Sequence, residues 1–397
     1  MSKWKTCALA EIGEIVGGAT PSTKDKSNYE NGTISWITPK DLSTHSGRYI
    51  SRGERMITEN GMNSCSTRLL PKNSILFSSR APIGYIAIAQ NEMCTNQGFK
   101  SIIPNSDMDY LFIYYLLLFN KDNIENMGSG TTFKEVSGNT MKSINVSIPE
   151  SIDEQRKIAS ILSSIDDKIE LNNKINENLE LQAQAIFKSW FVDFKPFGGV
   201  MPEDWTEKSV YDLAEYINGA AFKKEEYSTE GLPIIKISEL KNGITDSTQY
   251  CCVKKDEKYY FDNKSILFSW SGNPETSIDT FLWYRGKAIL NQHTFRVVSK
   301  YNAPAFTYFL LKYLKPEFAH IASNKQTTGL GHVTVADLKR LQFSCSKKTI
   351  EEFEKVSQPL FDMIYNTYIE SNRLAELRDT LLPKLMNGEI DVSEVKI

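Results

Sequence analysis

The stretch Lys72-Asn-Ser-Ile-Leu-Phe77 returns in this 397-residue chain as Asn263-Lys-Ser-Ile-Leu-Phe268, 191 residues further on. One match of this length could be a coincidence. Four more matching pairs of segments follow in the same order, at offsets of 194 to 197 residues. They pair Asn96-Gln97 with Asn291-Gln292, Tyr114-Tyr-Leu-Leu117 with Tyr308-Phe-Leu-Leu311, Thr131-Thr132 with Thr327-Thr328, and Val136 with Val333. The sequence therefore predicts one structural unit that occurs twice.

Each copy begins with a block in which short strand-like runs alternate with glycine and proline turns. The runs include Ile34–Ile37, Ser74–Phe77 and Tyr85–Ile88 in the first copy and Ile234–Ile237 in the second. An apolar helix, Tyr110–Phe119 in the first copy, follows near the end of each block. Strands of this length with turn signals between them predict an α+β fold with mostly antiparallel strands.

Each copy ends in a long helix. Ser151-Ile-Asp-Glu154 and Thr349-Ile-Glu-Glu352 both have the pattern of a capping box at a helix start. The first helix, over about 153–191, carries a heptad seam, and at 1.5 Å per residue it is roughly 58 Å long. The seam comprises Ile158, Leu162, Ile165, Ile169, Asn172, Asn176, Leu179, Ala183, Ile186 and Trp190. The second seam is predicted at Phe353, Val356, Leu360, Met363, Leu374, Leu377 and Leu381.

Two amphipathic helices in one chain are expected to pack against each other. Asn172 and Asn176 lie on the first seam, where a buried amide fixes the register of a helix pair at some cost in stability. The alternative is that both side chains face solvent. The predicted organisation is an α+β block over 1–150, a long helix within 151–195, a second block over 196–346 and a second helix within 347–397.

Composition excludes several classes of protein. The six cysteines show no C-x-x-C spacing, which argues against a zinc ribbon or a disulfide scaffold and favours a reduced, cytoplasmic chain. The longest apolar run, Tyr110–Phe119, is too short to cross a bilayer, and no secretory signal is visible. The net charge is −3, but residues 1–150 and 201–345 carry +1 each. Any nucleic-acid binding must therefore depend on local basic patches or on a partner.

Catalytic signatures are absent from the sequence. The nearest approach to an adenine-methyltransferase motif, Asn273-Pro-Glu-Thr276, lacks the second proline and the aromatic residue. No phosphate-binding glycine loop occurs, and the four histidines have no metal-ligand spacing. The sequence predicts a chain with no catalytic site and no metal site.

Three segments resemble one family. They are Pro149–Leu162, which opens the first helix, Phe187–Pro196, which closes it, and Leu377–Ile390, which closes the second. Together with the internal repeat, they are similar to the specificity subunit of type I restriction–modification systems, over essentially the whole chain. The recognition blocks themselves carry little of the resemblance.

The resemblance implies two similar target recognition domains separated by two long helices, conserved in such proteins, that form an antiparallel coiled coil. Each domain would read one half of a bipartite, asymmetric site in double-stranded DNA. The helices would space the halves and dock two modification (methyltransferase) subunits. S-adenosylmethionine and ATP would bind to those subunits and to separate restriction (translocase and nuclease) subunits, and this chain would hold no cofactor. The alternative is a helical scaffold whose α+β blocks bind protein or peptide partners.

Three polar clusters in each block are candidates for DNA contact, because Arg and Lys suit guanine or phosphate and Asn, Ser and Thr suit base edges. The first cluster is Ser78, Ser79 and Arg80, matched by Ser269, Trp270, Ser271 and Asn273. The second is Thr38 and Lys40, matched by Lys236 and Ser238. The third is Thr131, Thr132 and Lys134, matched by Lys325, Gln326 and Thr327, with His332 nearby. The alternative for each cluster is an ordinary polar turn.

Two repeated features have a structural interpretation. Asn96-Gln97 and Asn291-Gln292 are identical in both copies, whereas readers of two different half-sites would differ. We therefore expect a turn common to both blocks rather than base contacts. The aromatic residues Trp190, Phe191, Phe194 and Phe197 are expected to pack in a core, with docking of a modification subunit as the alternative.

Overall fold

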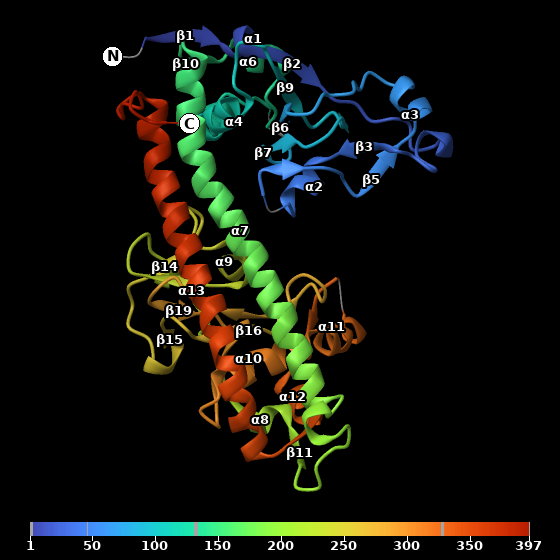
Figure 1. Cartoon of the computed structure of the whole chain (residues 1–397), viewed down its shortest axis with the longest axis vertical. Helices are drawn as coiled ribbons and strands as arrows, with labels where there is room; N and C mark the ends of the chain where they lie inside the picture. The colour runs from blue at the N-terminus through green and yellow to red at the C-terminus, as the bar shows by residue number, and fades with distance from the viewer. Residues whose placement is uncertain (1–2, 46, 131–133, 327–328, 397) are drawn as a thin grey trace. The chain divides into compact units, whose positions relative to one another are not determined.

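The computed structural model describes residues 3–45, 47–130, 134–326 and 329–396. The chain forms two compact units. Unit 1 contains residues 1–170 and 374–397, and unit 2 contains residues 171–373. In Figure 1, the strands around β6 belong to unit 1 and those around β16 to unit 2.

Two helices of 40 residues each, α7 (Ile152–Phe191) and α13 (Lys347–Met386), contribute residues to both units. In unit 1, Asp166 of α7 contacts Arg378 of α13, and in unit 2 Asn172 of α7 contacts Glu370 of α13. Residue numbers that rise along one helix as they fall along the other define an antiparallel pair. The predicted antiparallel helices are therefore confirmed.

The seam predicted for α7 is confirmed, because its ten positions are buried or half-buried. The seam predicted for α13 is wrong at three of its seven positions, because Val356, Met363 and Leu377 are 44%, 51% and 47% exposed. Phe353, Leu360, Leu374 and Leu381 are buried or half-buried, as predicted. The buried face of α13 in unit 2 is displaced by one residue and contains Ile350, Phe353, Ser357, Phe361, Ile364 and Tyr365. Phe361, Ile364 and Tyr365 belong to the core of unit 2, so the recognition block sets which face of α13 is covered.

Asn172 and Asn176 are 1% and 3% exposed, so the solvent-facing alternative is wrong. Asn172 Nδ2 donates to Glu370 Oε2 at 2.8 Å. The side-chain oxygen of Asn172 and both polar atoms of Asn176 have no hydrogen-bond partner among the described residues. Buried amides with so few partners lower stability, which is the cost expected of residues that fix a helix register.

The helix starts correct one prediction. α7 begins at Ile152, beside the expected Ser151. α13 begins at Lys347, two residues before the predicted cap at Thr349. Ser346 supplies the cap instead, because its Oγ accepts the backbone N–H of Thr349 at 3.2 Å. The Thr349 hydroxyl accepts the Trp205 indole N–H at 3.0 Å, so it belongs to the core.

Unit 1 has three sheets in its described part, in the strand orders β2-β9-β6-β7-β4, β5-β3-β8 and β1-β10. Neighbouring strands are antiparallel except in the pairs β3–β8 and β4–β7. The strands are β1 (Trp4–Ala8), β2 (Gly13–Gly17), β3 (Ile34–Ile37), β4 (Tyr49–Ile50), β5 (Arg55–Ile57), β6 (Ile75–Ser79), β7 (Ile83–Ala89), β8 (Cys94–Thr95), β9 (Lys100–Pro104) and β10 (Asn145–Pro149).

Unit 2 repeats this plan with the orders β12-β20-β16-β18, β14-β13-β19-β15, β11-β22 and β17-β21. Its strands are β11 (Thr206–Ser209), β12 (Ala214–Asn218), β13 (Leu232–Ile235), β14 (Tyr250–Cys251), β15 (Tyr260–Phe261), β16 (Ile266–Ser269), β17 (Ser271–Gly272), β18 (Asp279–Leu282), β19 (Ala288–Leu290), β20 (Thr294–Ser299), β21 (Gly331–His332) and β22 (Gln342–Cys345). The predicted α+β class and internal repeat are confirmed.

The remaining helices are short. Unit 1 contains α1 (Leu9–Ile12), α2 (Pro39–Ser43), α3 (Glu59–Asn63), α4 (Tyr110–Phe119), α5 (Lys121–Asn126), α6 (Gly138–Ser143) and η1 (Lys26–Asn28). Unit 2 contains α8 (Val210–Leu213), α9 (Ile237–Asn242), α10 (Pro304–Tyr313), α11 (Lys315–Asn324), α12 (Val335–Arg340), η2 (Lys195–Phe197), η3 (Lys224–Glu226) and η4 (Glu257–Tyr259).

The central strand of each unit is buried on both faces. In β6, Ile75 and Phe77 pack against α4, while Leu76 faces a second core with Ile37 and Ala87. In unit 2, Ile266 and Phe268 of β16 face the larger core, and Leu267 faces a second, smaller core. The core of unit 1 is completed by Leu385, Met386 and Val392, which lie near the end of the chain.

Candidate nucleic-acid interface

In unit 1 the structure joins the first and third predicted clusters. The N–H of Val136 donates to the carbonyl of Ser79 at 2.9 Å. This bond brings Glu135 opposite Arg80 in an isolated antiparallel β-bridge. The segment after β6 therefore lies beside the segment that carries Lys134, although 54 residues separate Arg80 from Lys134 in the sequence.

Unit 2 makes the same junction. The N–H of Val333 donates to the carbonyl of Trp270 at 2.8 Å, and β17 pairs with β21 so that Ser271 lies opposite His332. The offsets of 191 and 197 between these residues and their unit 1 counterparts match the sequence repeat. The junction is therefore part of the fold that is duplicated.

The second cluster is joined to the first by the turn that contains Asn96 and Gln97, or Asn291 and Gln292 in unit 2. In unit 1, Ile37 O accepts the N–H of Asn96 at 2.9 Å, and Gly98 O accepts the N–H of Ser79 at 2.7 Å. In unit 2, the equivalent bonds join Ile235 to Asn291 at 3.1 Å and His293 to Trp270 at 3.4 Å. The described segments of the three clusters thus meet in each unit. We call the place around Thr38, Arg80 and Lys134 edge 1 and the place around Lys236, Ser271 and His332 edge 2.

The Asn-Gln turns are structural, as the sequence suggested. Gly18 and Gly219 lie so close to them that an added Cβ would stand 2.2 Å from Asn96 O and 2.1 Å from Asn291 O, respectively. The side chain of Asn96 accepts the N–H of Gly98 at 2.8 Å within its own turn. These residues hold the edges together through their backbones.

Three predicted DNA contacts must be corrected. Ser78, Ser79 and Ser269 are 0% exposed, because their strands continue further than the polar residues suggested. Ser78 Oγ donates to Pro82 O at 2.8 Å, and Ser79 Oγ donates to Gly98 O at 3.2 Å. Hydroxyls in these positions face the interior and do not reach DNA.

Edge 1 gathers cations around one carboxylate. Arg80 Nη1 lies 3.5 Å from Glu135 Oε2, and Lys100 Nζ lies 3.5 Å from Glu135 Oε1. Lys134 is exposed next to Glu135. Glu135 and Lys100 were not predicted from the sequence. Lys100 is the first residue of β9, and nothing in its sequence neighbours indicates a site.

The other edge 1 candidates differ in their availability. Thr38 caps α2, and its N–H and Oγ both donate to Asp41 Oδ2, at 2.7 and 2.6 Å. Lys40 is exposed and pairs with Glu54 at 2.7 Å on the surface. Thr131 and Thr132 lie outside the described residues. The accessible cations are Lys40, Arg80 and Lys134.

Edge 2 is aromatic at its centre. Trp270 Nε1 donates to Asn218 Oδ1 at 3.2 Å, and its ring centroid lies 5.5 Å from that of His293 and 5.8 Å from that of Phe295. His332 is exposed opposite the half-buried Ser271. Asn273 is exposed and turns its Oδ1 inward to accept the N–H groups of Glu275 and Thr276, both at 3.1 Å.

The charged candidates at edge 2 are already paired. Lys236 Nζ donates to Gln249 and lies 5.1 Å from the centroid of the Tyr227 ring, while Ser238 Oγ donates to Glu239 at 2.8 Å. Lys325 forms an ion pair with the buried Asp337. Gln326 donates to Gly329 O at 2.8 Å, and Thr327 lies outside the described residues.

Asp337 shows how firmly the Lys325 segment is held. Burial alone would raise the pKa of Asp337, but Lys325 and the hydrogen bonds from Thr334 outweigh it, so the pKa lies below its ordinary value. Thr334 Oγ1 donates to Asp337 Oδ2 at 2.6 Å at the start of α12. The equivalent cap of α6 in unit 1 is neutral, because Ser137 pairs there with Thr140.

The aromatic cluster at the end of α7 packs in the core of unit 2. Phe191, Phe194 and Phe197 each place their ring centroid 5.5 to 5.6 Å from that of Trp205. Trp190 packs against Phe197 and Phe353. Trp205 was not predicted, because it stands alone in the sequence between polar residues.

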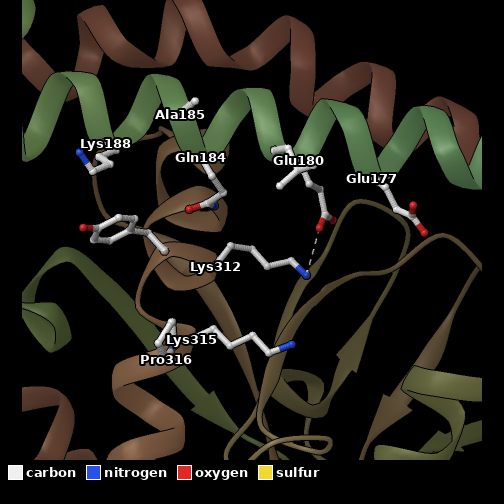
Figure 2. Close-up of a pocket in the computed structure, with 10 residues that line it drawn as sticks. Glu177, Glu180, Gln184, Ala185, Lys188, Lys312, Lys315 and Pro316 are labelled. Carbon is white, nitrogen blue, oxygen red and sulfur yellow. Dashed lines mark ion pairs between the residues drawn. The ribbon is translucent and has the colours of Figure 1, made fainter. Parts of the chain in front are cut away.

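Unit 2 also contains an open groove of about 710 Å³ between α7 and the start of α11. Figure 2 shows Lys312 pointing toward Glu180, at 3.5 Å. Lys312 and Lys315 also pair with Asp279, at 3.4 and 2.5 Å, and the Tyr308 hydroxyl donates to Glu180 at 2.8 Å. The main charges of the groove are thus neutralised within the protein, and the groove is not an anion site.

Two further observations apply to the described part of the chain. Its helices include none long and apolar enough to span a membrane. Among the same residues, no three His, Cys, Asp or Glu side chains are grouped as they would be around a metal ion.

Comparison with known proteins identifies the family. The model of the "Type I restriction modification DNA specificity domain" matches the chain twice, over residues 1–181 and 202–378. The chain belongs to this type I specificity family. It is 36% identical to the type I restriction enzyme MjaIX specificity subunit of Methanocaldococcus jannaschii, over 99% of this chain and 94% of that protein. It is 24% identical to the HindI specificity subunit of Haemophilus influenzae, over 81% and 88% of the two chains.

The fold is also found in a solved structure of the family. The crystal structure of the type I S subunit from M. genitalium superposes with a TM-score of 0.53 at 16% identity, covering 97% of this chain and 96% of that one. The resemblance drawn from the sequence is confirmed, and the scaffold alternative is not favoured. As a specificity subunit, the chain is a DNA-recognition component and not a catalytic one.

Proposed function

We propose that unit 1 and unit 2 each read one half of a bipartite DNA target through edge 1 and edge 2. The observation that supports this most directly is that two equivalent edges of a duplicated fold carry different side chains. Edge 1 presents Arg80 and Lys134 around Glu135, whereas edge 2 presents Ser271 and His332 beside Trp270. Different base-reading groups on one backbone plan suit two unlike half-sites.

The charge of the edges suits DNA held partly by other subunits. Edge 1 has more cations than carboxylates, but edge 2 pairs its main cation, Lys325, with Asp337. Phosphate contacts dominate the affinity of proteins for DNA. A chain with few unpaired cations at its edges is therefore expected to bind tightly only within a complex, in which modification subunits complete the grip on the duplex.

The long helices offer surfaces for those subunits. In unit 2, the helices expose apolar side chains that no recognition block covers, namely Leu171, Leu181, Val356 and Met363, at 51%, 68%, 44% and 51%. If these side chains form a contiguous apolar patch, contact with a partner protein would cover it. We propose that α7 and α13 dock two modification subunits and set the gap between the half-sites.

The proposed complex assigns its chemistry to the partners. Modification subunits would bind S-adenosylmethionine, and restriction subunits would use ATP, while this chain contributes sequence recognition. The domain boundaries at 150, 195 and 346 are part of this proposal, with the recognition domains over 1–150 and 196–346.

Methylation mapping tests the function. The chain is co-expressed with its modification subunits in a host that lacks other adenine methylation, and the host DNA is sequenced for methyl-adenine. The expected result is a split, asymmetric motif that disappears when this chain is omitted. An active modification subunit that methylates the same motif without this chain would contradict the proposal.

A further inference from the structure

We infer that Arg80 reads a guanine in the half-site of unit 1 and that Glu135 is the residue that positions it. This inference rests on the proposed function and deepens it, because it names the base and the residue at edge 1. Arginine is the side chain best suited to guanine, since its planar fork matches the O6 and N7 acceptors in the major groove.

The position of Arg80 suits a base contact. It follows β6 directly, and its side chain is 35% exposed at the point where the three clusters converge. Its neighbour Lys100 is only 16% exposed, and it points into the protein toward Glu135. Among the described residues, Arg80 has one hydrogen-bond partner, Glu135, at 3.5 Å from Nη1. A guanidinium has five N–H donors, so most of them remain available to a ligand.

Glu135 is held more rigidly than the arginine. Its backbone exchanges two hydrogen bonds with Ser129, at 2.9 and 3.0 Å, and the next residue, Val136, is bonded to Ser79. The carboxylate therefore has a fixed place beside β6. A fixed carboxylate restrains the long arginine side chain, which lowers the conformational entropy lost on binding.

The carboxylate itself is not the base reader. One of its oxygens faces Arg80 and the other faces Lys100, both at 3.5 Å. A glutamate that read cytosine would need a free oxygen directed at the base. Lys100 offsets the charge of Glu135, so a positive charge remains at Arg80 for the electron-rich edge of guanine.

The backbone after Arg80 has an equivalent in unit 2. Ala81 has a φ of +50°, in the left-handed region that non-glycine residues adopt at a cost. The equivalent position in unit 2, Gly272, has a φ of +123°. Both units have a positive φ at this point, and unit 1 adopts it without a glycine. The shared backbone places Arg80 and Ser271 at equivalent points of the two units.

Unit 2 lacks this determinant. By the pairing of the strands, Arg80, Glu135 and Lys100 correspond to Ser271, His332 and Phe295. None of these three can form a guanidinium–carboxylate pair. Recognition of guanine by an arginine is therefore specific to unit 1. We expect one G·C pair, in one half-site, whose recognition depends on Arg80.

Motif sequencing of the complex tests the inference. The chain carrying R80A, R80K or E135Q is co-expressed with the modification subunits, and methyl-adenine is mapped as for the wild type. For R80A we expect one G·C position in one half-site to become degenerate, with the preference for guanine reduced roughly tenfold to a hundredfold. The other half-site keeps its sequence.

R80K separates base reading from phosphate contact. Lysine keeps the charge but cannot bind guanine in two places, so the same position should become degenerate while overall methylation persists. E135Q keeps the shape of Glu135 and removes its charge. We expect it to weaken the preference at that position while the thermal midpoint of the subunit stays unchanged.

A matched control is R68A, because Arg68 also pairs with a glutamate of unit 1, Glu14, on the surface. It should leave the motif unchanged. An R80A or R80K complex that methylates the full wild-type motif would overturn the inference and leave the proposed function standing. Uniformly weaker methylation of an unchanged motif would make Arg80 a phosphate contact and would also overturn it. A wild-type complex without any motif would refute the proposed function, and the inference with it.

Discussion

Edge 1 and edge 2 occupy the same place in two copies of one fold, but they differ in chemistry. Edge 1 holds an ionic group of Arg80, Lys100 and Glu135, and edge 2 holds an aromatic group around Trp270 and His293, with His332 nearby. The backbone hydrogen bonds that build the two edges are equivalent. They include the bonds made by Asn96 and Asn291 and the bonds accepted by the carbonyls of Ser79 and Trp270. In both copies the same backbone hydrogen bonds build the edge, whereas the side chains exposed on it differ.

The contacts of each block with the long helices show a second contrast. In unit 1, Asp166 receives hydrogen bonds from Tyr115 at 2.6 Å and from Arg378 at 2.8 Å. In unit 2, Glu180 of α7 accepts a hydrogen bond from the Tyr308 hydroxyl, and its Oε2 lies 3.5 Å from Lys312 Nζ. Positions 180 and 378 are equivalent in the two helices, 198 residues apart, but one is acidic and the other basic. Both blocks thus place a tyrosine hydroxyl on a carboxylate of α7, but the cation beside that carboxylate comes from α13 in unit 1 and from the block itself in unit 2.

The largest effect is expected from breaking the helix contact of unit 1. R378L leaves the Asp166 carboxylate, which is 5% exposed, with Tyr115 as its remaining bonded partner. An uncompensated buried charge costs about 3 to 5 kcal/mol. The matched change in unit 2, K312M, should cost about 1 kcal/mol, because Glu180 is more exposed and keeps Tyr308, and Asp279 keeps Lys315. Urea unfolding measures both, and equal losses would contradict the contrast.

The second prediction transfers the chemistry of edge 1 to edge 2. The double variant S271R/H332E places an arginine opposite a glutamate on the β17–β21 pair. We expect the half-site read by unit 2 to gain a guanine preference of about tenfold at one position. S271R alone is the control, because it lacks the carboxylate that restrains the arginine. Methylation mapping that shows no change of motif for the double variant would argue against edge 2 as a base-reading surface.

The third prediction uses the difference between the two helix caps. Because the pKa of Asp337 is lowered in the folded chain, its ion pair stabilises unit 2 above the ordinary carboxyl pKa, and this contribution is lost as the pH falls through that range. D337N should lower the thermal midpoint at about pH 6, and this loss should shrink as the pH falls below the ordinary carboxyl pKa toward the lower pKa of the folded chain. T140V at the neutral cap of unit 1 should show no such pH dependence. A pH-independent effect of D337N would contradict the ion pair.

The smallest effect is expected at the outer margin of edge 1. Lys40 is fully exposed and paired only with Glu54, so K40A should not change the stability of the subunit. If Lys40 contacts a phosphate, the slope of log K against log salt should fall by about 0.9 for the assembled complex. S238A, at the equivalent place in edge 2, removes no charge and should leave the slope unchanged. Equal slopes for K40A and the wild type would exclude Lys40 as a phosphate contact.

Much of the fold could be predicted from the sequence because repetition and helix periodicity are local signals. The duplicated block, the course of α7 and the apolar helix Tyr110–Phe119 were all found in this way. The covered face of α13 was not, because Phe361, Ile364 and Tyr365 follow the recognition block and not the heptad. A periodic pattern shows which faces are apolar, but tertiary packing decides which of them is covered.

The candidate site was predicted less well, for a reason visible in β6 and β16. Both strands are buried on both faces and end in buried serines, so a polar residue at a strand end does not indicate an exposed loop. The hydroxyls of Ser78 and Ser79 in β6 bond to neighbouring backbone carbonyls. Arg80 was found because it is charged and lies just beyond the strand. Glu135 and Lys100 become meaningful only once β-pairing brings three distant segments together.

The division of the chain between the two units has a consequence for synthesis. Unit 2 is a continuous stretch, residues 171–373, whereas the core of unit 1 needs Leu385, Met386 and Val392. The block translated first is therefore completed last, after the whole of unit 2 has left the ribosome. Until then its apolar helix faces lack their final partners, and a nascent chain in this state is a substrate for chaperones. Truncation before Leu385 would consequently damage unit 1, although most of that unit is encoded by residues 1–170.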